Sequence, residues 1–377
     1  MVVPLAGRVI AACVGGLLVI TAARSVIGTI IVPRPVGSWL TRWVDKLVNA
    51  AYLIATARIP DHKRRDRVLA GQAATILLAQ LVAWLAIFFI GFTLLLWPFV
   101  GDISDAFTTA GPALWEIGSE NFRGAGVRTI ADIASITGIV TVTLQIAYLP
   151  TLYSAFNRRE TEVTLLNARA GVPSWGPELL ARARYGLGSG TSTIDTLPDL
   201  YEQWERWASD VSESHTTYLP LVRFRSPKPL SSWVTALLAV LDSAALYLSL
   251  SPKAAPVVPA RLCLRSGFLC FRDIARAMGI ELPDEPDPSA GITVTYEEYL
   301  HGIDQIRYVD FPTERDPAEA WQDFVGWRVN YEQAAYAVAA ALDVVPALWS
   351  GPRRRPVPPI APLRPPQGRP PGNGASP

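Results

Sequence analysis

Residues 76 to 100 read ILLAQLVAWLAIFFIGFTLLLWPFV and form most of an uncharged apolar run that extends from Ala70 to Val100. A helix of about 20 apolar residues is long enough to cross the hydrocarbon core of a bilayer, which is about 30 Å thick. This run is therefore predicted to be a transmembrane helix. A second run, Ile130 to Leu152, contains Asp132 and Gln145 but retains enough apolar positions to span as well.

A polar stretch, DISDAFTTAGPALWEIGSENFRGAGVRTIAD, joins the two runs at residues 102 to 132. Pro112 suits the first turn of a helix, because the backbone N–H that proline lacks has no partner there. We therefore expect a short helix from Pro112 to Gly118 and a non-helical loop from Ser119 to Gly126. Irregular backbone at membrane depth needs protein or a water-filled cavity around it. This order of elements predicts a re-entrant pore loop, and the alternative is an ordinary glycine-rich extracellular turn.

Several other stretches accompany this order: Gly124 to Gly126 (GAG), Tyr148 to Glu160 (YLPTLYSAFNRRE), Thr164 to Gly171 (TLLNARAG) and Pro346 to Arg354 (PALWSGPRR). With these, the chain resembles the bacterial two-helix, potassium-channel-like pore family, in its actinobacterial branch with a large C-terminal region. The likeness covers most of the chain. It implies a homotetramer around a four-fold cation pore, in which backbone carbonyls replace the hydration shell of the ion. A monovalent cation such as K⁺ would be the permeant ion.

The family's filter reads Thr-Val/Leu-Gly-Tyr/Phe-Gly. Aligning the glycines places the filter-like segment at Phe122, Arg123, Gly124, Ala125 and Gly126. Phe122 supplies no hydroxyl ligand, Ala125 lacks the bulk of the bracing aromatic side chain, and Arg123 brings positive charge near the cation path unless a carboxylate pairs with it. These departures favour an alternative in which the channel scaffold no longer conducts.

The second apolar run carries a polar stripe. Thr137, Thr141, Gln145 and Tyr148 are spaced by four, four and three residues, which places them on one helical face. The stripe is interpreted either as pore-lining or as a helix-packing face, because hydroxyl and amide groups serve both purposes. Gly138 and Pro150 are the expected hinge positions, since each weakens the helical hydrogen bonding.

Composition supports residence in a membrane: half of the 377 residues are hydrophobic and the mean hydropathy is +0.23. Residues 9 to 32 form a third predicted span, interrupted only by Arg24, with a cleaved signal peptide as the alternative. Between this span and the run at Ala70, residues 33 to 67 hold eight Lys or Arg against three Asp. The positive-inside rule places that loop in the cytoplasm of a bacterial plasma membrane, with the N-terminus outside and the C-terminal region cytoplasmic.

Within that basic loop, aromatic and aliphatic residues recur at near-helical spacing around Arg42 and Lys46: Trp39, Leu40, Trp43, Leu47, Tyr52 and Ile54. A basic amphipathic helix of this kind suits the surface of a membrane. The same periodicity fits a helix that packs on its own cytoplasmic domain.

The region after Asn157 is predicted to be an all-α cytoplasmic domain. Helices are expected over Leu197 to Ser214, Thr293 to Tyr308 and Pro317 to Leu342, and Ser231 to Leu250 is expected to be a buried helix rather than a fourth span, because it contains Asp242. The tail after Gly351 is rich in Pro, Arg and Gly and is predicted to be disordered. The predicted domains are 1–32 (first span), 33–68 (basic loop), 69–157 (pore domain), 158–350 (cytoplasmic domain) and 351–377 (tail).

No sequence motif for catalysis, cofactor binding or metal binding is recognised, and the net charge of +1 argues against a nucleic-acid partner. The chain is thus predicted to be a mostly α integral membrane protein with three transmembrane helices, a re-entrant pore loop and a cytoplasmic domain for an unknown ligand or protein. Cation conduction is the predicted function. A non-conducting, membrane-anchored scaffold or sensor is the alternative.

Overall fold

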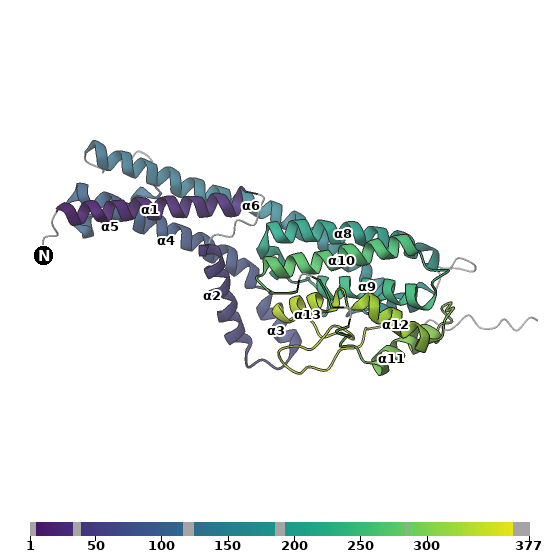
Figure 1. Cartoon of the computed structure of the whole chain (residues 1–377). Helices are drawn as coiled ribbons and strands as arrows, with labels where there is room; N and C mark the ends of the chain where they lie inside the picture. Colours follow the sequence, from purple (N-terminus) through teal and green to yellow (C-terminus); the bar gives the residue numbers. More distant parts are fainter. Residues whose placement is uncertain are drawn as a thin grey trace, which may run out of the picture. The chain divides into compact units, whose positions relative to one another are not determined.

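The computed structural model describes residues 5–32, 39–115, 124–184, 193–283, 285–287 and 289–364. These residues are mostly α-helical and form no strand, which confirms the predicted mostly α fold (Figure 1). The chain divides into two compact units, Met1–Ser154 and Ala155–Pro377, and each is described by itself.

The first unit is built from long apolar helices. It contains α1 (Leu5–Ile30), α2 (Trp39–Thr56), α3 (His62–Leu69), α4 (Gln72–Val100), α5 (Ile103–Ala113) and the first part of α6 (Ala125–Ala170). In Figure 1, α1 lies alongside α4, and α5 packs against α4. A hydrophobic cluster around Trp84, Phe88 and Phe92 of α4 holds these helices together.

The helices α1 and α4 approach closely at two glycines. A Cβ atom added to Gly15 would lie 2.5 Å from the carbonyl oxygen of Gly91, so only glycine fits there. Small residues of this kind let the backbones of membrane helices touch. Further along the same contact, the buried Trp84 Nε1 donates a hydrogen bond of 2.9 Å to Ser25 Oγ, so these two polar groups are paired within an apolar interface.

The short helix α5 corrects one expectation. It begins at Ile103 and ends at Ala113, so Pro112 lies in its last turn rather than its first. The reason is tertiary packing: Ala106, Ala110 and Ala113 form a stripe that is completely buried, and this stripe determines where the helix runs. Residues 116 to 118 of the expected helix lie outside the described part of the chain.

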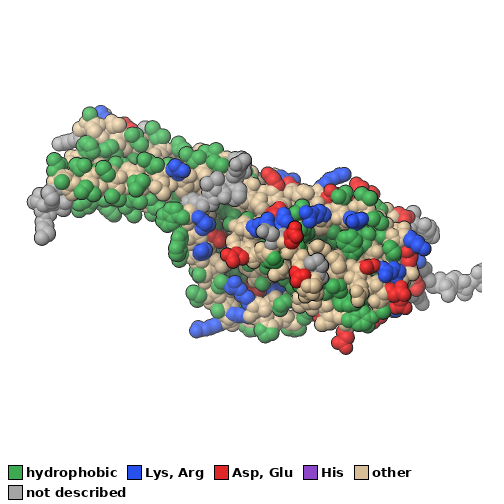
Figure 2. All heavy atoms as spheres, viewed as in Figure 1, with side chains coloured by type: hydrophobic (Ala, Val, Ile, Leu, Met, Phe, Trp, Pro, Cys, Tyr) green, Lys and Arg blue, Asp and Glu red, His purple; other side chains and the backbone are tan. Residues whose placement is uncertain are grey.

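Four of the described helical segments are long and apolar enough to cross a membrane: α1, the segment His62–Val100 that includes α4, α6, and a helix of the second unit, α9 (Trp233–Leu250). The first three leave much of their apolar surface exposed. On the face drawn in Figure 2, hydrophobic side chains cover most of α1 and the helices beside it. This surface is consistent with insertion into a membrane.

The second unit contains the last part of α6 and a group of helices packed around α9. These are α7 (Gly176–Ala183), α8 (Leu197–Thr217), α10 (Val257–Ala277), α11 (Tyr296–Arg307), α12 (Pro317–Arg328) and α13 (Glu332–Ala341), with short 3₁₀ turns at η1 (Thr193–Thr196) and η2 (Leu219–Arg223). Every residue of α9 is buried, and α7, α8, α10, α12 and α13 all contact it. The expectation of a buried helix at Ser231 to Leu250 is therefore confirmed.

Two C-terminal expectations need correction. The predicted helix Pro317 to Leu342 is two helices, because α12 ends at Arg328 and α13 begins at Glu332. This break allows the Arg328 side chain to turn into the core, where it is completely buried.

The first part of the tail after Gly351 is folded rather than disordered. The backbone N–H of Leu363 donates to the carbonyl oxygen of Val172 at 2.9 Å, and Ile360 forms an isolated bridge with Ala347. Arg353 is buried and donates to the carbonyl oxygens of Val344 and Ser350. Residues 365 to 377 lie outside the described part of the chain.

Candidate functional site

The filter-like segment is described only in part. Phe122 and Arg123 lie outside the described residues. Gly124 has a φ of +94°, a left-handed backbone conformation that favours glycine, and it directly precedes α6. Ala125 and Gly126 belong to the first turn of α6, so this pair is helical and not part of the expected non-helical loop.

The end of α5 contacts α6 closely. Ser135 Oγ of α6 donates a hydrogen bond of 2.6 Å to the carbonyl oxygen of Ala113, and both residues are buried. One turn further, a Cβ atom on Gly138 would collide with the carbonyl oxygen of Leu114. Gly138 was predicted to be a hinge, and its observed position gives it a packing function at this contact. The second predicted hinge, Pro150, is exposed and lies within α6, which continues past it to Ala170.

The polar stripe of α6 faces largely into the chain itself. Thr141, Gln145 and Tyr148 are buried, and Thr137 is half-buried. The hydroxyl groups of Thr137 and Thr141 donate to the carbonyl oxygens of Ile133 and Thr137, at 2.7 Å in each case. Such bonds satisfy a hydroxyl within an apolar environment. Within one copy of the chain, this geometry favours the interpretation of the stripe as a packing face.

The opposite face of α6 is exposed and apolar. It presents Ile133, Ile136, Val140 and Ile146, with Thr143 as its polar member. This face is free to contact lipid or to line a cavity between copies of the chain. The sequence pattern did not identify this face, because isoleucine and valine are also typical of helices that face only lipid.

In the second unit, the end of α6 contributes a buried cation, Arg159. Its guanidinium donates to Glu160 Oε1 at 2.9 Å, to His215 Nε2 at 2.9 Å, and to the carbonyl oxygens of Leu221 at 2.9 Å and Phe224 at 2.7 Å. Its charge and hydrogen-bonding groups are thereby satisfied inside the protein. Burial lowers the pKa of Arg159, and the Glu160 carboxylate opposes this effect.

His215 is held in its neutral form by this arrangement. Burial lowers its pKa well below the usual value, and the charge of Arg159 lowers it further. Because Nε2 accepts from Arg159, Nδ1 carries the proton and is placed 3.0 Å from Ser214 Oγ, which itself donates to the carbonyl oxygen of Asp210. The ring thus connects α6 to α8 by a chain of hydrogen bonds.

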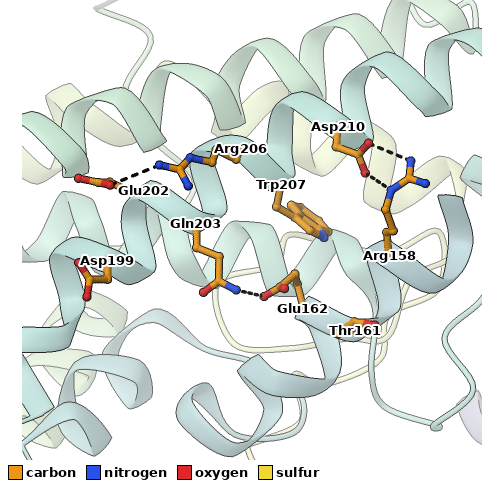
Figure 3. A pocket seen from close by; sticks show the side chains of 9 residues that line it. All are labelled: Arg158, Thr161, Glu162, Asp199, Glu202, Gln203, Arg206, Trp207 and Asp210. Carbon is orange, nitrogen blue, oxygen red and sulfur yellow. Dashed lines mark hydrogen bonds and ion pairs between the residues drawn. The ribbon is translucent and has the colours of Figure 1, made fainter.

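A groove of about 810 Å³ runs along the surface between the end of α6 and α8 (Figure 3). Arg158 pairs with Asp210 at 3.0 Å across it, and Gln203 Nε2 donates to Glu162 Oε2 at 2.7 Å. Trp207 forms part of its wall, with Nε1 donating to the carbonyl oxygen of Arg159 at 3.2 Å. These polar groups bond to one another, so paired charges line much of the groove.

The core of the second unit holds another buried ionic cluster, centred on Arg328. Its guanidinium donates to Asp242 of α9, to Glu332 Oε2 at 2.6 Å, to Tyr336 Oη at 2.9 Å and to the carbonyl oxygen of Trp349 at 2.7 Å. Burial alone lowers the pKa of Arg328, but the Asp242 carboxylate beside it raises that pKa well above the usual value. The cluster is structural, because it has no exposed member through which a ligand could enter.

Sequence reasoning did not identify either buried arginine. Arg158 and Arg159 are neighbours in the sequence, but only Arg158 remains exposed. One signal did exist for the second cluster: an acid such as Asp242 in an otherwise apolar helix indicates a buried partner that can pair with it. Its partner, Arg328, lies 86 positions along the chain and could not be selected from several arginines by pattern alone.

Among the described residues, no group of three or more His, Cys, Asp or Glu side chains comes together in a way that could hold a metal ion. Comparison of the chain with family models, curated proteins and solved structures finds no match.

Proposed function

We propose that this chain is a potassium-channel-like membrane protein that assembles as a homotetramer and conducts a monovalent cation such as K⁺. In this proposal α4 is the outer helix, α5 the pore helix and α6 the inner helix. The N-terminus lies outside and the second unit lies in the cytoplasm.

One observation carries the proposal: a long apolar helix, a short helix packed against it, and a second long helix that contacts the end of the short one. The contact consists of the Ser135 bond to Ala113 and the close approach of Gly138 to Leu114. The C-terminal end of a helix carries a partial negative charge. If the end of α5 points towards a central axis, it would stabilise a cation there.

The position of α5 also suggests where to look for the filter. In a pore of this type the filter follows the C-terminal end of the pore helix, and α5 ends at Ala113. The sequence between α5 and α6 contains two glycines, Gly118 and Gly124. Either glycine could therefore belong to the filter.

The experiment is cation flux through the purified full-length protein in liposomes, with Gly118→Asp and Gly124→Asp as variants. A carboxylate in the filter would change or abolish conduction. The matched control is Gly326→Asp, a glycine of α12 with open space around its Cβ position. Flux that the control retains and a pore variant loses supports the proposal, whereas equal flux in all variants contradicts it.

A second candidate function is a non-conducting, membrane-anchored scaffold or sensor. It is favoured by the burial of Thr141, Gln145 and Tyr148, which leaves the polar stripe of α6 turned away from any path between subunits. A verified tetramer without flux, together with binding of a cytoplasmic partner to the second unit, would support this candidate.

A further inference from the structure

Helix α2 carries an apolar surface that nothing in the described chain covers. Trp39, Trp43, Leu47 and Ile54 are 56%, 57%, 65% and 76% exposed, respectively. They are spaced by four, four and seven residues, so they form one stripe along the helix. We call this stripe the apolar face of α2. Two exposed tryptophans and two exposed aliphatic side chains on one helix are costly in water and mark an interaction site.

The other side of α2 is fixed to the first unit. Gln72 Nε2 of α4 donates to Asn49 Oδ1 at 3.1 Å, and the hydroxyl groups of Tyr52 and Thr75 lie 2.8 Å apart. Val44 is buried on this side. The helix is therefore held in a defined orientation, and its apolar face is directed outward by these contacts.

Positive charge borders the apolar face. Arg42 and Lys46 are exposed, one turn apart, and Lys46 Nζ lies 6.0 Å from the centre of the Trp43 ring. On the following helix, α3, Lys63, Arg64 and Arg67 are also exposed. Residues 39 to 69 contain seven Lys or Arg against three Asp. A surface that combines exposed tryptophans with this excess of positive charge is complementary to anionic lipid headgroups.

The place of α2 in the chain also favours lipid. It lies between α1 and α4, the helices proposed to cross the membrane, and it runs across the direction of α1 rather than along it (Figure 1). Because α2 directly joins α1 to the segment of α4, it lies close to the ends of these two helices. Tryptophan is enriched at that depth, at the boundary between headgroups and acyl chains. Contact with a second copy of the chain explains the apolar side chains but not the basic residues beside them.

We propose that α2 is an in-plane helix that inserts its apolar face into the interface of an anionic leaflet, with Arg42 and Lys46 bound to lipid phosphate groups. This inference requires membrane insertion of the chain but not conduction. Its test is therefore independent of the channel proposal.

The test compares two spin-labelled positions in the full-length protein. Ala50 and Ala55 are both exposed, and at 3.6 residues per turn Ala50 lies within the apolar face while Ala55 lies on another side of the helix. Replacing the exposed Cys13 by Ala leaves only the buried Cys263 and Cys270, so Ala50→Cys or Ala55→Cys supplies the reactive thiol. The protein is reconstituted in vesicles of phosphatidylcholine, with or without an equal amount of phosphatidylglycerol. Collisions of the label with oxygen and with a water-soluble nickel complex are then measured.

We expect the label at position 50 to show a several-fold higher ratio of oxygen to nickel accessibility than the label at position 55. The ratio at position 50 should rise when phosphatidylglycerol is present. The double variant Arg42→Gln and Lys46→Gln should lose that rise without a change at position 55. These exposed substitutions leave the contacts of α2 with α4 intact.

Two results would overturn the proposal. Nickel accessibility that is as high at position 50 as at an exposed position in water would show that the apolar face is in water. Protection of position 50 from both oxygen and nickel would show that protein, either a second copy or another partner, covers the face instead of lipid.

Discussion

Arg328 of α12 donates a hydrogen bond to the carboxylate of Asp242 in α9, and both side chains are completely or almost completely buried. Tyr331 Oη also donates to Asp242, at 2.8 Å, so the carboxylate is bonded from two sides. This relationship explains how a helix that is apolar enough to cross a membrane contains an acid at its centre. The acid joins the central helix of the second unit to the helices around it.

Replacing Arg328 by Met should destabilise the second unit by about 3–5 kcal/mol, because Asp242 would remain buried without its cation. The measurement is denaturant-induced unfolding of the full chain in detergent, followed by near-ultraviolet circular dichroism. Replacing Asp242 as well, with Leu, should restore part of the lost free energy, since both charges are then removed together.

The control for that prediction is Arg206→Met. The Arg206 side chain is 82% exposed and lies 3.7 Å from Glu202, so its removal should change the free energy of unfolding by less than about 1 kcal/mol. A similar loss for both variants would contradict the assignment of Arg328 as a stabilising centre.

Stability should decrease as the pH falls below about 6.5, in part because of His215. The ring is buried and neutral in the folded chain, where its pKa is well below the usual value, but it binds a proton after unfolding. Stabilisation by this residue is therefore complete above the unfolded pKa and is lost on acidification, by at most about 1.4 kcal/mol per pH unit.

The variant His215→Gln isolates this contribution, because other groups also titrate in acid. The difference in unfolding free energy between the natural chain and the variant should shrink from pH 8 to pH 5. A difference that stays constant over this range would exclude His215 as its source.

Gly15→Ala should weaken the contact between α1 and α4. The new methyl group would lie 2.5 Å from the Gly91 carbonyl oxygen, and overpacking of this kind costs about 1–3 kcal/mol. The neighbouring Gly16 is the matched control, because the nearest atom to its Cβ position is 3.9 Å away. Thermal unfolding in detergent should show a lower midpoint for Gly15→Ala alone, and equal midpoints would refute the close approach.

Gly138→Ala should impair the channel, if the proposed function is correct. The methyl group would collide with the Leu114 carbonyl oxygen and displace the end of α5 from α6. We expect cation flux to fall about tenfold or more, equivalent to roughly 1.4 kcal/mol in the barrier. The control is Gly326→Ala, at an uncrowded position of α12, which should leave flux unchanged. Unchanged flux in both variants would show that the contact between Gly138 and Leu114 is not needed for conduction.

The long elements could be predicted from the sequence because they depend on local pattern. The uncharged run that ends at Val100 became α4, and the charge of Asp242 correctly indicated a buried helix at α9. The helices expected from Leu197 and from Thr293 likewise begin near those positions, at Leu197 and Tyr296.

The failures have a common physical cause, which is tertiary contact. Pro112 looked like the start of a helix, but the buried alanine stripe of α5 placed it at the end. The break between α12 and α13 depends on where Arg328 finds its partners, and the folded part of the tail depends on bonds such as Leu363 to Val172. Within the candidate site, spacing indicated which residues of α6 share a face but not which face the rest of the chain covers.

The most direct test of the central claim is the reversal potential of the full-length protein in a planar bilayer with K⁺ on one side and Na⁺ on the other. The proposed function predicts single-channel currents whose reversal potential lies towards the K⁺ equilibrium potential and that disappear in a Gly118→Asp or Gly124→Asp variant. A verified tetramer that carries no current under any voltage would contradict the proposal and would leave the membrane-anchored scaffold as the function to pursue.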